Sequence, residues 1–278
     1  MQPLLVHHGI LRKLRMTKID DFFSALRRAF CSVLVAIIAL QSPSPLAQTT
    51  IPKPINIDAL RSGSSFTSST LQAQQKDDDA NPGMLWVDQG RELFARDCVT
   101  CHAKPDGLAT RLPKLTANAE VVTLESQINR CQAERVKQPA YAMESQPILA
   151  LAAYVAFSSR GLKQVIAPNV TESAPWKRAQ LEFTRVQGRL DFSCRTCHDA
   201  LYGKRIRNQA ISQGHGVGFP AYRVEWQTLG SLNRRLRACF FGMATTVPAV
   251  SSPILSELEL YLAWRAEGLP IEAPAVRR

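Results

Sequence analysis

Two short sequences, CVTCH (98–102) and CRTCH (194–198), constrain this chain more than any other feature. Both have the pattern Cys-x-x-Cys-His, which is the attachment signature of c-type haem. Two thiols about one helical turn apart can reach both vinyl groups of one porphyrin, and the adjacent histidine then lies under the iron as its proximal ligand. Two copies, 96 residues apart, therefore predict two covalently bound c-type haems.

The motifs assign residues to each haem. The predicted attachment cysteines are Cys98 and Cys101 for the first haem and Cys194 and Cys197 for the second, with His102 and His198 as proximal ligands. A thioredoxin-like redox pair has similar spacing but is typical of a βαβ unit, and the sequence shows no such alternation. Half of a zinc site is a second alternative, although further zinc ligands are scarce.

The two halves of the chain resemble each other around these motifs. GRELFARDCVTCHAK (90–104) parallels GRLDFSCRTCHDA (188–200), and PILALAAYVAFSSRGL (147–162) parallels PILSELELYLAWRAEGL (253–269). The two later segments have apolar residues at helical spacing and end at a glycine, a usual helix stop. We therefore expect a mainly α fold of two cytochrome-c-like domains related by an internal pseudo-repeat.

The expected domains cover residues 86–170 and 171–278, and an extended N-terminal arm over residues 48–85 precedes them. Residues 1–47 have the pattern of a secretory signal peptide, in which the apolar run AFCSVLVAIIAL (29–40) follows a pair of arginines. We expect cleavage near Ala47, with Met16 as a possible true start, and a periplasmic protein without a stable membrane anchor. An uncleaved anchor is the alternative.

The distal ligands follow partly by elimination. His7 and His8 belong to the leader and two other histidines are proximal ligands, so only His215 remains. Two bis-histidine haems are therefore excluded by count. The remaining candidates are methionines (Met143 and Met243) and thiols (Cys131 and Cys239), both usable as haem ligands.

The repeat favours the thiols. Cys131 lies 23 residues before Tyr154, and Cys239 lies 22 residues before Tyr261. The two cysteines therefore occupy equivalent places, whereas the methionines do not align. A Cys131–Cys239 disulfide and buried inert thiols remain as alternatives.

The segment SLNRRLRACFF (231–241) contains no helix breaker and can form a helix. Arg235 and Cys239 are then four residues apart and share one face. A guanidinium suits a divalent oxyanion and stabilises a thiolate. The alternatives for Arg235 are a partner for a haem propionate and a surface charge, and His215 either lines the pocket or is structural.

The net charge of +11 includes +4 from the leader, so the chain after residue 47 keeps 28 basic and 21 acidic residues, or +7. This charge suits acidic partners or small anions as well as simple solubility. An exported protein rarely meets nucleic acid, so we expect no nucleic-acid partner.

Beyond both haem motifs, long stretches of the chain resemble the SoxA family of bacterial thiosulfate oxidation. These are DDDANPGMLWVDQG (77–90), QGHGVGFPAYRVEWQTLGSLNRRLRAC (213–239) and GLPIEAPAVRR (268–278). The resemblance covers nearly the whole chain after the leader, and it is to the dihaem type because the first motif is present.

The resemblance implies an enzyme, L-cysteine S-thiosulfotransferase. Such proteins pair with a small monohaem cytochrome, SoxX, and join thiosulfate to a cysteine of the carrier SoxYZ, while two electrons leave through haem to an acceptor cytochrome c. The resemblance also implies the roles of three residues. Cys239, often a persulfide in the family, is the distal ligand of the second haem, which is the catalytic one, and Arg235 binds the substrate. Cys131 is the distal ligand of the first haem.

Two other functions remain open from the residues alone. A periplasmic dihaem electron carrier without substrate chemistry would normally use methionine ligands and would leave Arg235 without a role. A haem-based sensor is less favoured, because no signalling module is visible.

Overall fold

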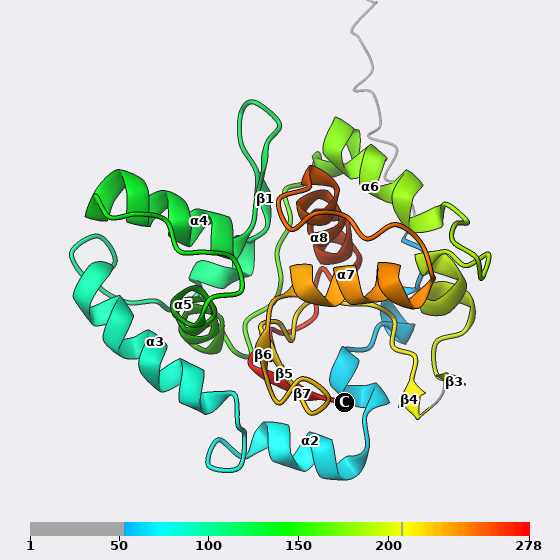
Figure 1. The fold of residues 1–278 in the computed structure, drawn as a ribbon, viewed down its shortest axis with the longest axis horizontal. Coiled ribbons are helices and arrows are strands. Elements are labelled where there is room, and N and C mark those ends of the chain that lie inside the picture. The colour runs from blue at the N-terminus through cyan, green and yellow to red at the C-terminus, as the bar shows by residue number, and fades with distance from the viewer. Residues whose placement is uncertain (1–52, 207) are drawn as a thin grey trace, which may run out of the picture. The chain divides into compact units, whose positions relative to one another are not determined.

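The computed structural model describes residues 53–206 and 208–278, which form one compact unit (Figure 1). The predicted leader, with Met16 and the cleavage site near Ala47, lies outside the described residues, as do residues 48–52 of the predicted arm. Within the described ranges, no helix has the length and apolar character needed to cross a membrane.

Helices dominate the described chain, which confirms the prediction of a mainly α protein. The α-helices are α2 (Ser69–Lys76), α3 (Met84–Asp97), α4 (Leu124–Cys131), α5 (Gln146–Phe157), α6 (Ala174–Thr184), α7 (Leu232–Gly242) and α8 (Pro253–Arg265) in the part of the chain that the structure describes. Helix α3 packs on α5, and α6 packs on α8 (Figure 1). The first Cys-x-x-Cys-His motif starts at Cys98, directly after α3, whereas the second starts at Cys194, after a loop that follows the end of α6 at Thr184.

Local sequence explains where the helices begin. The Thr123 side chain accepts a hydrogen bond from the backbone N–H of Ser126, and the Ser126 hydroxyl oxygen accepts one from the backbone N–H of Thr123, which closes a capping box before α4. Ser231 caps α7 through its hydroxyl oxygen, which accepts from the N–H of Arg234. Pro253 occupies the first turn of α8, where its missing N–H costs nothing.

Two hydrophobic clusters hold the helix pairs together. In the α6–α8 pair, Trp176, Tyr261 and Trp264 pack with ring centroids 5.0 to 5.6 Å apart. In the α3–α5 pair, Phe94 packs edge-on against Tyr154 at 5.5 Å. These aromatic residues at helical spacing form core.

Short strands were not expected from the sequence. Two small hairpins join β1 (Lys114–Leu115) to β2 (Val121–Val122) and β3 (Arg205–Ile206) to β4 (Gln209–Ala210). The third sheet has the order β6-β5-β7, from Thr228–Gly230, Ala221–Arg223 and Ala275–Arg277. Strand β5 lies within the glycine-rich stretch 212–226 and pairs in parallel with β7, so that Arg223 lies opposite Arg277.

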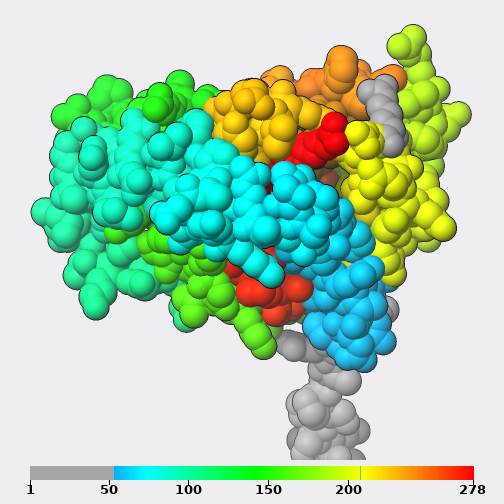
Figure 2. Space-filling model, turned by 90° about the horizontal axis from the view of Figure 1, so that it is seen from below, coloured from blue at the N-terminus to red at the C-terminus, as the bar shows by residue number. Residues whose placement is uncertain are grey.

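The segment before α3 lies over the end of the chain. It contains η1 (Ile57–Ala59), η2 (Gly63–Phe66) and α2. The hydroxyl of Ser64 donates to Glu272 at 2.7 Å, and the Asn81 amide donates to the carbonyl of Pro274 at 2.9 Å. Figure 2 shows this segment in cyan and blue, crossing the face where the red C-terminal segment emerges. It therefore forms one wall of the pocket described next.

Candidate functional site

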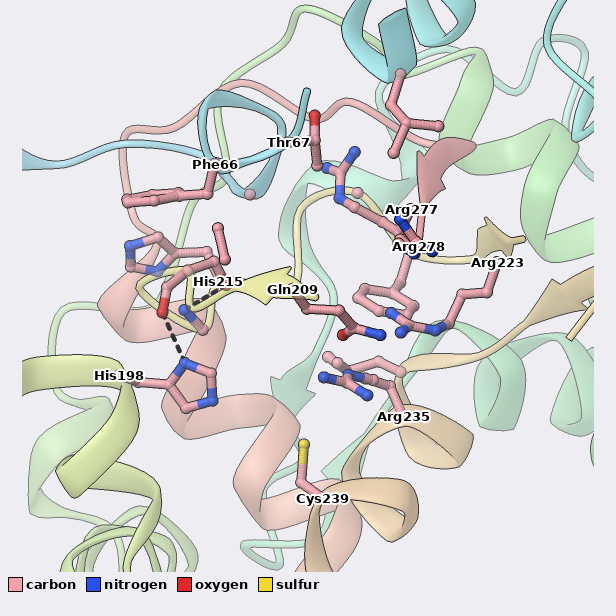
Figure 3. A pocket seen from close by; sticks show the side chains of 18 of the residues that line it. Phe66, Thr67, His198, Gln209, His215, Arg223, Arg235, Cys239, Arg277 and Arg278 are labelled. Carbon is pink, nitrogen blue, oxygen red and sulfur yellow. Dashed lines mark hydrogen bonds between the residues drawn. The ribbon is translucent and has the colours of Figure 1, made fainter. Parts of the chain in front are cut away.

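Helix α7 carries two of the predicted site residues into one cavity. The helix predicted over residues 231–241 is confirmed, and Arg235 and Cys239 both line a cavity of about 220 Å³. His198 lines the same cavity from the other side (Figure 3). The structure thus brings together three residues that the sequence assigned to the second haem site.

The His198 ring is held in a fixed orientation. Its Nδ1 lies 2.8 Å from the backbone carbonyl oxygen of Ser212 and donates to it, which leaves Nε2 as the free nitrogen on the side facing Cys239 (Figure 3). Gly214 makes this approach possible, because it has a φ of 78° and a Cβ there would lie 2.9 Å from His198 Cγ. A histidine oriented through its second nitrogen is typical of a metal ligand.

The Cys239 thiol lies in a positively charged environment. Burial alone would raise its pKa, but the charge of Arg235, the contact with His198 and the charge of Arg223 outweigh burial and lower the pKa to about 6. Cys239 also affects one of the attachment cysteines. Burial, followed by the negative charge of Cys239, raises the pKa of the Cys194 thiol to about 12.

Sequence reasoning missed four arginines that line this cavity: Arg205, Arg223, Arg277 and Arg278. Arg223 is 4% exposed, and its Nε has no hydrogen-bond partner among the described residues. Burial, followed by the charge of Arg235, lowers the pKa of Arg223 to about 10. Only the pairing of β5 with β7 places Arg223 and the C-terminal arginines together, so no local signal could have found them.

Other residues near the motif have structural contacts. His215 lines the cavity and is buried, with Nε2 3.2 Å from Gln213 Oε1. Arg234 stacks on the Trp226 ring at 4.3 Å, and the Arg237 Nε donates to the Pro248 carbonyl at 3.0 Å. These two arginines therefore point away from the cavity.

The equivalent residues of the first half lie at helix ends. Cys98 follows α3 directly, and Cys131 is the last residue of α4. Burial, then the charges of Asp97 and Cys131, raise the pKa of the Cys98 thiol to about 11. His102 and Cys101 are exposed.

All six cysteines in the described part of the chain are free thiols, so the alternative Cys131–Cys239 disulfide is not formed. Met243 is 7% exposed and packs in the α6–α8 core rather than lining the cavity.

The residues present fit a c-type haem at the second motif. Two free thiols, an oriented histidine with one free nitrogen and a thiol opposite it form the donor set that such a haem uses. Arg265 also has buried Nε and Nη1 groups without partners among the described residues, although its Nη2 binds Asp199 at 2.5 Å. It stands over the Phe183 ring, which lies 6.5 Å from the His198 ring. Such donors suit a carboxylate, which a haem propionate supplies.

Comparison with known proteins gives a consistent result. A profile of the SoxA/TsdA cytochrome c domain matches residues 85–164. L-cysteine S-thiosulfotransferase subunit SoxA of Rhodovulum sulfidophilum is 33% identical over 232 residues, which cover 79% of this chain and 81% of that protein. The chain belongs to the SoxA family. The subunit of the same name from Pseudaminobacter salicylatoxidans is 32% identical over 78% of this chain and 80% of that protein.

The fold of SoxA proteins matches as well. The crystal structure of SoxXA from P. pantotrophus superposes with a TM-score of 0.73 and 26% identity, covering 79% of this chain and 87% of that chain. The resemblance inferred from the sequence is therefore confirmed. The family and the matched cytochrome c domain imply covalently bound c-type haem.

Proposed function

We propose that this chain is the SoxA subunit of an L-cysteine S-thiosulfotransferase, which oxidatively joins thiosulfate to a cysteine of a SoxYZ-like carrier. The names of the curated relatives support this activity. The observation that carries the assignment in this molecule is the position of Cys239, which shares one cavity with His198, Arg235 and Arg223. A pure electron carrier has no use for arginines around a thiol.

Two c-type haems are part of this proposal. Cys194, Cys197 and His198 hold the second, with Cys239 as the distal ligand. The equivalent residues of the first are Cys98, Cys101 and His102, with Cys131 opposite. The matching orders α3–α4–α5 and α6–α7–α8 support two cytochrome-c-like domains related by a pseudo-repeat (86–170 and 171–278), with residues 48–85 as an N-terminal arm. Bound haem supplies the path by which electrons leave the site.

The arginines bind the substrate. Thiosulfate is a dianion, and the Arg235 guanidinium can donate two parallel hydrogen bonds to its sulfonate oxygens. Arg223 has an unpartnered buried Nε and contributes a second charge. Together they orient the sulfane sulfur toward Cys239 and stabilise negative charge in a site that is partly closed to water.

Cys239 forms and then breaks a sulfur–sulfur bond. The Cys239 thiolate bonds to the sulfane sulfur of thiosulfate while two electrons are lost to an acceptor cytochrome c. The thiolate of the carrier cysteine, after losing its proton to solvent, then attacks that sulfur. Cys239 leaves as a thiolate, and the carrier keeps a cysteine S-thiosulfonate. A lowered thiol pKa favours Cys239 as the leaving group.

The remaining parts of the proposal concern partners and location. A SoxX-like monohaem cytochrome is the partner subunit, as the matched SoxXA structure suggests. The signal peptide over residues 1–47 directs the protein to the periplasm, where carrier and acceptor are met.

The test is the mass gained by purified SoxYZ carrier when it is incubated with thiosulfate, an electron acceptor and the complex of this protein with its SoxX partner. We expect wild type to add one thiosulfonate group and Cys239→Ala to add none, while visible absorption shows that haem stays attached at Cys194 and Cys197. An equal gain with both proteins would place the chemistry elsewhere.

A further inference from the structure

A second cavity lies where the two halves of the chain meet. It has a volume of about 70 Å³ and is lined by residues from the first half, such as Leu124, and from the second half, such as Leu232. Two of its lining residues are titratable, Glu125 from α4 and Glu259 from α8. The other lining side chains are apolar, except for the amide of Gln164. A polar pair therefore faces an otherwise apolar internal space.

Of the two carboxyl groups, that of Glu259 has fewer hydrogen-bond partners to offset its burial. It is 7% exposed, and no described residue donates a hydrogen bond to its carboxyl group. Glu257 on the same helix provides a contrast, because it is equally buried at 5% but accepts hydrogen bonds from Arg178 at 2.5 to 3.1 Å. A buried carboxylate without a cation is costly, and proteins avoid the cost by keeping the group protonated.

The groups that face the pair add further negative charge. Burial raises the pKa of Glu259 well above its usual range, and the charges of Glu125 and Glu144 raise it further. Burial also raises the pKa of Glu125, despite hydrogen bonds from its own backbone N–H and from Thr123. Glu144 accepts from the Ser231 hydroxyl at the start of α7. No cation acts on either buried carboxyl group in the described residues.

The cavity lies at the start of both helices that carry the predicted axial thiols. Helix α4 begins at Leu124 and α7 begins at Leu232, and both residues line the cavity. Cys131 and Cys239 each lie seven positions further along their helix. At a rise of about 1.5 Å per residue, each thiol lies about 10 Å along the helix axis from the cavity. A charge change at either site reaches the pair through low-dielectric protein.

We propose that Glu125 and Glu259 share a proton across this cavity and act as the internal proton acceptor for electrons that arrive in the protein. Each electron adds one negative charge. The pair responds by binding one proton from solvent at a carboxylate oxygen, and it releases that proton when the electron leaves to the acceptor cytochrome. The proton-holding role stands by itself, whereas its coupling to electrons rests on the proposed haem function.

Infrared difference spectroscopy of the haem-containing protein tests the shared proton. At neutral pH, we expect a carboxylic acid C=O band that shifts on exchange into D2O and is lost or roughly halved in Glu259→Gln and in Glu125→Gln. Glu257→Gln is the matched control and should leave the band unchanged, because that side chain is paired with Arg178 and does not line the cavity. No acid band in wild type, or the same band in Glu259→Gln, would overturn the proposal.

Potentiometric titration tests the coupling. We expect the midpoint potential of at least one haem to fall as pH rises in wild type and in Glu257→Gln, and at least half of that slope to be lost in Glu259→Gln. An unchanged slope in Glu259→Gln would refute the coupling. Haem content is measured on the same samples, and a protein without haem would contradict the proposed function while the infrared result still decides the proton-holding role.

Discussion

Replacing Arg235 is the sharpest test of substrate binding, because the structure isolates its contribution. Arg235 is half-buried beside Cys239, and no described residue neutralises it with an ion pair. In Arg235→Ala the cavity keeps Arg223 and the C-terminal arginines. The substitution therefore removes one guanidinium from the anion site without emptying the site of charge.

The expected loss follows from the hydrogen bonds removed. Each of the two hydrogen bonds that Arg235 donates to the sulfonate contributes about 1.5–3 kcal/mol. Because Arg235 is only half-buried and Arg223 remains in the cavity, we expect the net loss to be close to that of one such bond. A loss of about 2 kcal/mol corresponds to about a 30-fold fall in kcat/KM for thiosulfate. Arg235→Lys keeps the charge but not the planar fork, so we expect an intermediate loss.

The assay is thiosulfate-dependent reduction of the acceptor cytochrome in the presence of carrier and SoxX partner. Arg234→Ala is the matched control, since Arg234 is the neighbouring arginine on the same helix but stacks on Trp226 outside the cavity. We expect this control to stay near wild type. The reasoning is wrong if Arg235→Ala keeps wild-type kcat/KM, or if Arg234→Ala loses as much.

Three further predictions concern stability. Asp199→Ala should lower the free energy of unfolding by about 3–5 kcal/mol in urea denaturation, because it removes the ion-pair partner that the buried Arg265 has among the described residues. A loss below about 1 kcal/mol would contradict this. Gly214→Ala should lower the free energy of unfolding by about 1–2 kcal/mol because of the positive φ at this position, which thermal unfolding would measure. It should also displace the His198 ring, which visible absorption of the haem would report. An unchanged melting temperature would argue against backbone strain. The pKa of Glu259 is raised above 4.5 in the folded protein, so ionisation costs folding free energy; wild type should lose stability relative to Glu259→Gln as pH rises above 4.5, and parallel stability profiles would exclude this cost.

Sequence alone determined the parts of this protein that depend on short-range geometry. Five consecutive residues specify a haem attachment motif, because the thiols and histidine act within about one helical turn. The same range explains why the sequence is sufficient to place Arg235 and Cys239 on one helix face. The internal repeat then related Cys131 to Cys239, and long matching stretches indicated the SoxA family.

Tertiary structure alone decided which distant residues complete the site. Arg223 joins Arg277 in the site only because β5 pairs with the last strand of the chain, and three-residue strands leave too little pattern in a sequence to predict their partners. The Ser212 carbonyl meets His198 across a separation of 14 residues that has no local pattern. The Glu125–Glu259 pair depends on packing between segments far apart in sequence. Periodicity shows which face of a helix is apolar, but burial and charge environment arise only when the helices meet.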